Sequence, residues 1–128
     1  MTVRRGLWRA LLAASRVVAL AFALRPLAPG QNPENWFPYS DKLLHVGFFA
    51  ALWWLARRAD FAHGLALALV LLAFGVAIEA AQAGLTLTRE ASALDVLADV
   101  AGIALGWTVA ARLTGPVSSR RQPEEHGR

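Results

Sequence analysis

The stretch GLALALVLLAFGVAIEAAQ, residues 64–82, decides the fold class of this chain. No polar side chain occurs in residues 64–78, and the first ionisable group after them is Glu79, followed by Gln82. A helix on the surface of a soluble bundle needs a polar face, and this stretch has none. About 17–25 apolar residues cross a hydrocarbon core of about 30 Å. The stretch therefore predicts a transmembrane helix with polar groups at one end.

The composition of the whole chain supports a membrane protein. Of its 128 residues, 56% are hydrophobic and only 17% are charged, and the mean hydropathy is +0.41. Soluble domains average about 25% charged and about 45–50% apolar residues. The length suits a single domain. Since there is no cysteine, disulfides, thiolate metal ligands and cysteine nucleophiles are excluded.

Apolar segments recur along the chain and predict four helices. They cover residues 7–24, 42–56, 61–82 and 93–111, and the second is short for a membrane span. Polar or turn-forming segments separate them, at residues 26–40, 57–60 and 83–91. We expect an all-α, four-helix transmembrane bundle over residues 1–113 and a disordered cytoplasmic tail at 114–128. A soluble four-helix bundle is the alternative that residues 64–78 argue against.

The basic residues predict the orientation of the bundle. With four spans, one side carries nine of them: Arg4, Arg5, Arg9, Arg57, Arg58, Arg112, Arg120, Arg121 and Arg128. The other side carries three: Arg25, Lys42 and Arg89. Because lysine and arginine concentrate on the cytoplasmic side, we expect a multi-pass protein of the bacterial cytoplasmic membrane with both termini in the cytoplasm. The basic residues do not cluster on one amphipathic face, so we expect no nucleic-acid partner.

The first segment also has features of a signal peptide. Arg4 and Arg5 precede an apolar stretch that ends in small residues. Arg16 in the middle of that stretch is unusual for a signal peptide, and three further apolar segments follow. We therefore expect the first segment to be kept as a membrane span.

Polar residues at the helix ends predict a candidate pocket. An ionisable group inside a span costs roughly 2.5–3.5 kcal/mol on insertion scales, so it needs a partner or a function. The predicted topology puts all such residues on the extracytoplasmic side, and residues three or four apart share a helix face. We expect one pocket that opens outward, with the candidate residues Lys42, His45, Glu79, Gln82, Arg89, Asp95 and Asp99.

These motifs, in this order and spacing, resemble the VanZ-like family of small bacterial membrane proteins. The motifs are Asp41-Lys42-x-x-His45, Glu79-x-x-Gln82 and Arg89-x-x-Ser92-x-x-Asp95-x-x-x-Asp99-x-x-Gly102. The resemblance covers about residues 40–106, or three of the four expected helices. It implies a multi-span protein of the cell envelope, since the family is named for a protein associated with low-level teicoplanin resistance. It implies no known reaction, and the family usually has asparagine where this chain has Asp99.

Several of these residues also have a purely structural interpretation. Ser40 or Asp41 is a candidate N-cap of the second helix, and the spacing of Ser92 and Asp95 resembles a capping box for the fourth. Lys42 can be a snorkelling residue at a helix end, and Arg89 an ordinary loop charge. The pair Gly102 and Gly106 favours close helix packing over ligand contact.

Depth along the helices suggests a partner for Asp99. At about 1.5 Å per residue, Asp99 and Arg16 lie at a similar distance below the outer boundary. We therefore expect a buried ion pair between them.

The residue types leave three classes of function open. Lys42, His45 and Arg89 supply hydrogen-bond donors suited to phosphate or carboxylate, and the acidic residues can orient them or exchange protons. We favour a protein that binds or modulates an anionic envelope amphiphile, such as a lipid-linked cell-wall intermediate or a glycopeptide. An intramembrane acid–base enzyme acting on a lipid head group is the second class, and a small proton-coupled carrier or structural partner of a membrane complex is the third.

We expect no cofactor. A metal site from His45 and two carboxylates is conceivable, but the neighbouring lysine and arginine argue against it, so no metal is expected either. The sequence does not indicate the oligomeric state or whether a reaction is catalysed.

Overall fold

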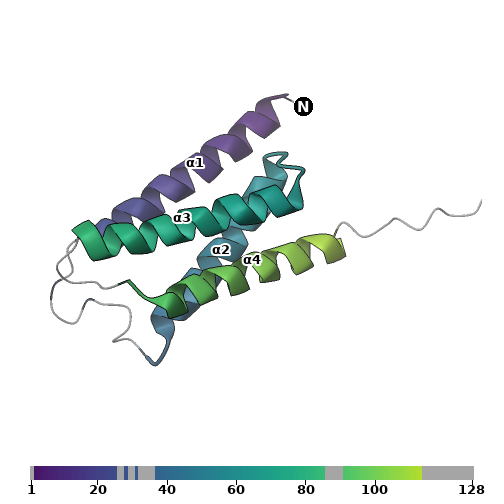
Figure 1. Cartoon of the computed structure of the whole chain (residues 1–128). Coiled ribbons are helices and arrows are strands. Elements are labelled where there is room, and N and C mark those ends of the chain that lie inside the picture. Colours follow the sequence, from purple (N-terminus) through teal and green to yellow (C-terminus); the bar gives the residue numbers. More distant parts are fainter. Residues whose placement is uncertain (1, 26–27, 29–30, 32–36, 86–90, 114–128) are drawn as a thin grey trace, which may run out of the picture.

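The described residues form four α-helices that run alternately up and down (Figure 1). The computed structural model describes residues 2–25, 28, 31, 37–85 and 91–113. The helices are α1 (Thr2–Leu24), α2 (Ser40–Arg58), α3 (Gly64–Leu85) and α4 (Ala93–Leu113). The start of α1, the turn between α2 and α3 and the end of α4 lie at the same end of the molecule (Figure 1). The predicted all-α fold with four helices is confirmed, and the predicted disordered tail at 114–128 lies outside the described residues.

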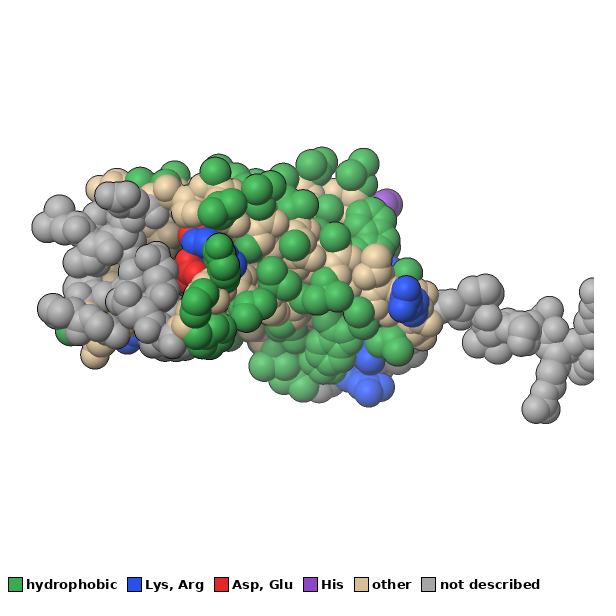
Figure 2. All heavy atoms as spheres, turned by 90° about the horizontal axis from the view of Figure 1, so that it is seen from below, with side chains coloured by type: hydrophobic (Ala, Val, Ile, Leu, Met, Phe, Trp, Pro, Cys, Tyr) green, Lys and Arg blue, Asp and Glu red, His purple; other side chains and the backbone are tan. Residues whose placement is uncertain are grey.

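Three of these helices are long and apolar enough to cross a membrane: α1 from Arg4, α3 and α4. The second helix is less apolar than these three, because two charged residues lie at each of its ends: Asp41, Lys42, Arg57 and Arg58. Large apolar side chains are exposed on the outer faces, such as Val17 and Leu65, each 68% exposed. Figure 2 shows apolar side chains over the middle of one face, with acidic and basic side chains together toward one end and further basic side chains toward the other. Such a surface suits surrounding lipid better than water.

The turn between α2 and α3 explains why α3 begins at Gly64 and not at Phe61, where the apolar segment begins. One guanidinium nitrogen of Arg57 donates to the carbonyl oxygens of both Phe61 and Ala62 at 2.8 Å. Asp60 has a left-handed backbone, with φ of 76°. Its carboxylate also forms an exposed salt bridge of 3.0 Å with Arg5 of α1. These contacts hold the residues before α3 in a turn.

The tightest packing in the bundle is between α2 and α4, along the face of α4 that carries Gly102 and Gly106. A Cβ atom on Gly102 would lie 2.5 Å from the carbonyl oxygen of Val46. A Cβ atom on Gly106 would lie 2.7 Å from the Cβ of Trp53. Trp53 is itself buried and stacks on Trp107 with ring centroids 5.0 Å apart. The glycines therefore act as the close-packing face that their spacing suggests, and they set how near α4 comes to α2.

The variant Gly102→Ala tests this packing. Because the obstructing atom belongs to the backbone of α2, the helices must separate, and we expect the free energy of unfolding to fall by about 1–3 kcal/mol. The matched control is Gly47→Ala in α2, where a Cβ meets nothing within 4 Å. That control should be as stable as the unaltered protein or more so, since alanine favours helix. Denaturant titration in detergent micelles measures both, and equal stability of the two variants would contradict the packing described.

Candidate functional site

Six ionisable side chains converge where α2 begins, α3 ends and α4 begins. Burial is nearly complete for the three acidic residues of α3 and α4: Glu79 is 4% exposed, Asp95 8% and Asp99 0%. The other three belong to α2 and are Asp41, Lys42 and His45. Residues more than fifty positions apart in the sequence thus meet at one end of an otherwise apolar bundle.

The carboxylate of Asp99 contacts His45 and occupies space that a side chain at position 75 would fill. The Nδ1 atom of His45 lies 2.7 Å from Oδ1 of Asp99. The other carboxylate oxygen lies against Gly75 of α3, and a Cβ there would collide with it and lie 3.1 Å from the Phe49 ring. When a neutral imidazole donates from Nδ1, its Nε2 keeps a lone pair. His45 is therefore oriented and left with a second nitrogen for chemistry.

Glu79 joins the end of α3 to the start of α4. Its Oε2 accepts a hydrogen bond of 2.8 Å from the backbone N–H of Ser92. In the capping box expected from the sequence, the carboxylate of Asp95 would accept that N–H. The structure corrects this expectation, because a side chain from another helix occupies the position. The carboxylate of Asp95 is thus available for other partners.

Lys42 lies between two carboxylates. Its Nζ forms a salt bridge of 2.7 Å with Oδ1 of Asp95 and also pairs with Asp41. The distance to Asp95 is that of an ion pair, although no group in the described part of the chain meets the geometry of a hydrogen bond to Oδ1. Neither Ser40 nor Asp41 is the N-cap of α2, since that position is taken by Tyr39 without a side-chain cap. Asp41 instead places a negative charge in the first turn, where it interacts favourably with the helix dipole.

The site carries more acidic than basic groups. Four carboxylates face one ammonium and one imidazole among the described residues: Asp41, Glu79, Asp95 and Asp99 against Lys42 and His45. If all four carboxylates are ionised, negative charges outnumber positive ones even with a protonated imidazole. An uncompensated buried charge costs several kcal/mol, so such a site favours a further positive group.

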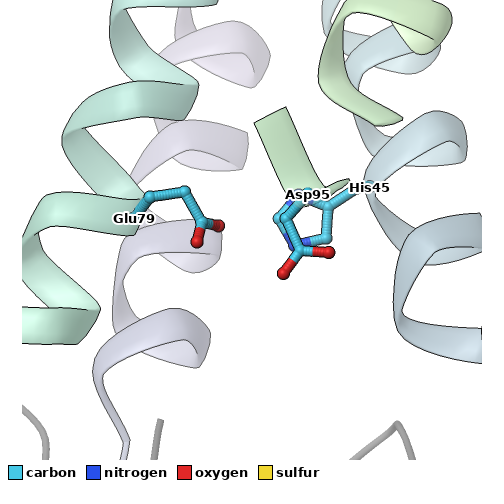
Figure 3. Close-up of side chains that lie close together, drawn as sticks. All are labelled: His45, Glu79 and Asp95. Atoms are coloured by element: carbon cyan, nitrogen blue, oxygen red, sulfur yellow. The ribbon is translucent and has the colours of Figure 1, made fainter. Parts of the chain in front are cut away.

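Three of these residues are arranged so that they could hold a metal ion. His45, Glu79 and Asp95 each offer a ligand atom, and these atoms lie within 4.8 Å of one another. Figure 3 shows Glu79 reaching from α3 toward Asp95 and His45. An imidazole nitrogen with two carboxylates is a donor set that divalent transition metals accept. The expectation of no metal came from the neighbouring basic residues, and Lys42 does contact Asp95.

Two residues of the predicted pocket have other surroundings or lie outside the described part. Gln82 donates to the carbonyl oxygen of Ala23 at 3.4 Å, so it contacts the end of α1. Arg89 lies outside the described residues.

Arg16 does not form the expected ion pair with Asp99. Its Nε donates to Leu12 at 3.4 Å, and it lines a pocket of about 440 Å³ that extends to Asp60 and His63. Asp99 pairs with His45. Equal depth along two helices does not predict a contact between side chains, because it does not give the direction in which each side chain leaves its helix.

Comparison of the chain with known protein families, curated proteins and solved structures found no match. The resemblance to the VanZ-like family therefore stays a prediction from the motifs around His45, Glu79 and Asp95.

Two substitutions at Glu79 separate its hydrogen bond from its charge. In chelator-treated protein, Glu79→Leu leaves the Ser92 N–H without its partner and should lower the free energy of unfolding by about 1–3 kcal/mol. Glu79→Gln keeps an oxygen for that N–H and removes a negative charge, so we expect stability equal to or above that of the unaltered protein. Denaturant titration in micelles compares them, and equal losses in both variants would disprove this role.

Proposed function

We propose that the chain is a VanZ-like multi-pass protein of a bacterial cytoplasmic membrane, with both termini in the cytoplasm. Three apolar helices and an alternating arrangement support this topology. The second helix is the fourth span in this proposal, with Arg57 and Arg58 snorkelling at its cytoplasmic end. The bias of basic residues supports the same orientation.

We further propose that the converging polar side chains bind the head group of an anionic envelope amphiphile. The observation that carries this proposal is the meeting of ionisable groups from three helices at one end of the bundle. Lys42 supplies an ammonium whose side chain is 22% exposed, so a head group can reach it. Lipid-linked cell-wall intermediates and glycopeptides are the ligand classes that the family resemblance implies, along with a link to teicoplanin-type resistance.

One observation favours a second candidate, an acid–base enzyme acting on the same head group. The contact between His45 and Asp99 orients an imidazole, whose other ring nitrogen can accept and return a proton. In this candidate function, His45 moves a proton and Lys42 holds the anionic head group.

The topology can be tested with single cysteines, because the chain contains none. We expect a cysteine at Gln31 to react with a membrane-impermeant maleimide in intact cells. A cysteine at Ser118 should react only after the membrane is permeabilised, because the proposed topology puts the C-terminal tail in the cytoplasm. Labelling of position 118 in intact cells would contradict the proposed orientation.

Native mass spectrometry of the purified protein tests lipid binding. We expect a co-purifying anionic lipid whose retention falls about 10–150-fold in Lys42→Gln, since a charge-assisted hydrogen bond contributes about 1.5–3 kcal/mol. The control Arg58→Gln, at the other end of α2, should retain the lipid. Bare protein, or equal retention in both variants, would contradict head-group binding at this site.

The same measurement separates the enzyme from the binding protein. An enzyme should change the mass of the retained lipid, and His45→Ala should retain the lipid without that change. A retained lipid of unchanged mass in the unaltered protein would contradict the enzymatic candidate.

A further inference from the structure

The buried acidic groups of the site lack sufficient positive partners among the described residues. Glu79 is 4% exposed, and its Oε1 is buried without a hydrogen-bond partner in the described part of the chain. Oδ2 of Asp99 is in the same situation. Buried polar atoms are nearly always paired, so each such atom needs an explanation. An ion that completes the site is one explanation.

Glu79 also belongs to a cluster of three residues that could hold a metal ion. The ligand atoms of His45, Glu79 and Asp95 lie within 4.8 Å of one another, and the carboxylate of Glu79 points toward the other two side chains (Figure 3). Nitrogen and oxygen ligands bind Zn²⁺ at about 2.0–2.2 Å, which puts neighbouring ligand atoms about 3–4 Å apart. Side-chain movements of about 1 Å would bring the three ligands to these distances.

We propose that His45, Glu79 and Asp95 bind one divalent transition-metal ion, of the Zn²⁺ or Mn²⁺ kind. Asp99 holds one ring nitrogen of His45, which leaves the other nitrogen as the ligand. A carboxylate behind a metal-bound histidine fixes the ring and strengthens the ligand, so Asp99 is a positioning residue. The nitrogen ligand favours a transition metal over Mg²⁺ or Ca²⁺, which prefer oxygen.

Charge balance and the position of Lys42 agree with this assignment. Among the described residues, four ionised carboxylates and a neutral imidazole would face a single ammonium, and a divalent ion would reduce that excess of negative charge from three to one. Lys42 contacts Oδ1 of Asp95 and also has Asp41 as a partner. The ion and the ammonium can therefore share Asp95.

A bound ion also explains how a site rich in carboxylates can take an anionic head group. Three protein ligands leave coordination positions open, where an oxygen of a phosphate or carboxylate can bind. This part of the inference rests on the proposed function, whereas metal binding itself does not.

The experiment is metal titration of tag-free, chelator-stripped protein in phosphatidylcholine nanodiscs, with equilibrium dialysis and elemental analysis. We expect one Zn²⁺ or Mn²⁺ per chain. Glu79→Gln and Asp95→Asn should each weaken binding more than about 100-fold, and Asp99→Asn about 10–100-fold. The matched controls Asp60→Asn and His63→Ala change exposed residues in the turn before α3 and should bind as the unaltered protein does.

Thermal unfolding of the same samples guards against a misfolded variant. With chelator present, Glu79→Gln should unfold no earlier than the unaltered protein, while the stabilisation that added metal produces should be lost. Absence of stoichiometric binding would overturn the proposal, as would an effect of His63→Ala equal to that of Glu79→Gln.

Nanodiscs that also contain phosphatidylglycerol distinguish the two proposals. Metal binding without metal-dependent retention of the anionic lipid would contradict head-group binding and leave the metal site intact. Retention of the lipid by metal-free protein would contradict the bridging role of the ion.

Discussion

The structure depends on accommodating one carboxylate, that of Asp99, which has no exposed surface. A carboxylate in an apolar interior is stable only with a partner that compensates its lost hydration. His45 of α2 provides that partner at 2.7 Å, and Gly75 of α3 provides the space. Three helices are therefore fixed relative to one another around a single side chain. The glycines that follow Asp99 on the same face of α4 let its backbone approach α2 closely enough for the contact.

The polar site and the fold are parts of the same set of contacts. Glu79 accepts the N–H of Ser92 just before α4 begins, so a residue of the candidate site also connects two helices. Lys42 joins α2 to Asp95 in the first turn of α4. A substitution at such a residue changes both the charge of the site and the packing around it. Isosteric variants such as Glu79→Gln are therefore needed to separate chemistry from folding.

Much of the fold could be predicted from the sequence, because long apolar periods and their breaks are local properties. Residues 64–82 alone indicated a helix without a polar face, and the spacing of Gly102 and Gly106 indicated a close-packed one. The residues of the site could be grouped because the predicted topology puts them at the same end of their helices. What remained undetermined was the direction of each side chain around its helix axis, which depends on tertiary packing.

The missed contacts follow from this limit. Arg16 and Asp99 were matched by depth, yet the partner of Asp99 is His45, 54 positions away. Ser92 and Asp95 fit a local capping pattern, yet Glu79 accepts the N–H of Ser92 from another helix. Gly75 lay within an apolar run, and its one distinguishing signal was its place one turn before Glu79.

A double-mutant cycle between His45 and Asp99 tests the central claim most directly. The free energy of unfolding in micelles is measured for the unaltered protein, His45→Ala, Asp99→Ala and the double variant. If the two side chains stabilise each other as described, the double variant should lose less stability than the sum of the single losses, with a coupling of about 0.5–3 kcal/mol. Losses that add within about 0.3–0.5 kcal/mol would show that the two residues act independently and would contradict the account.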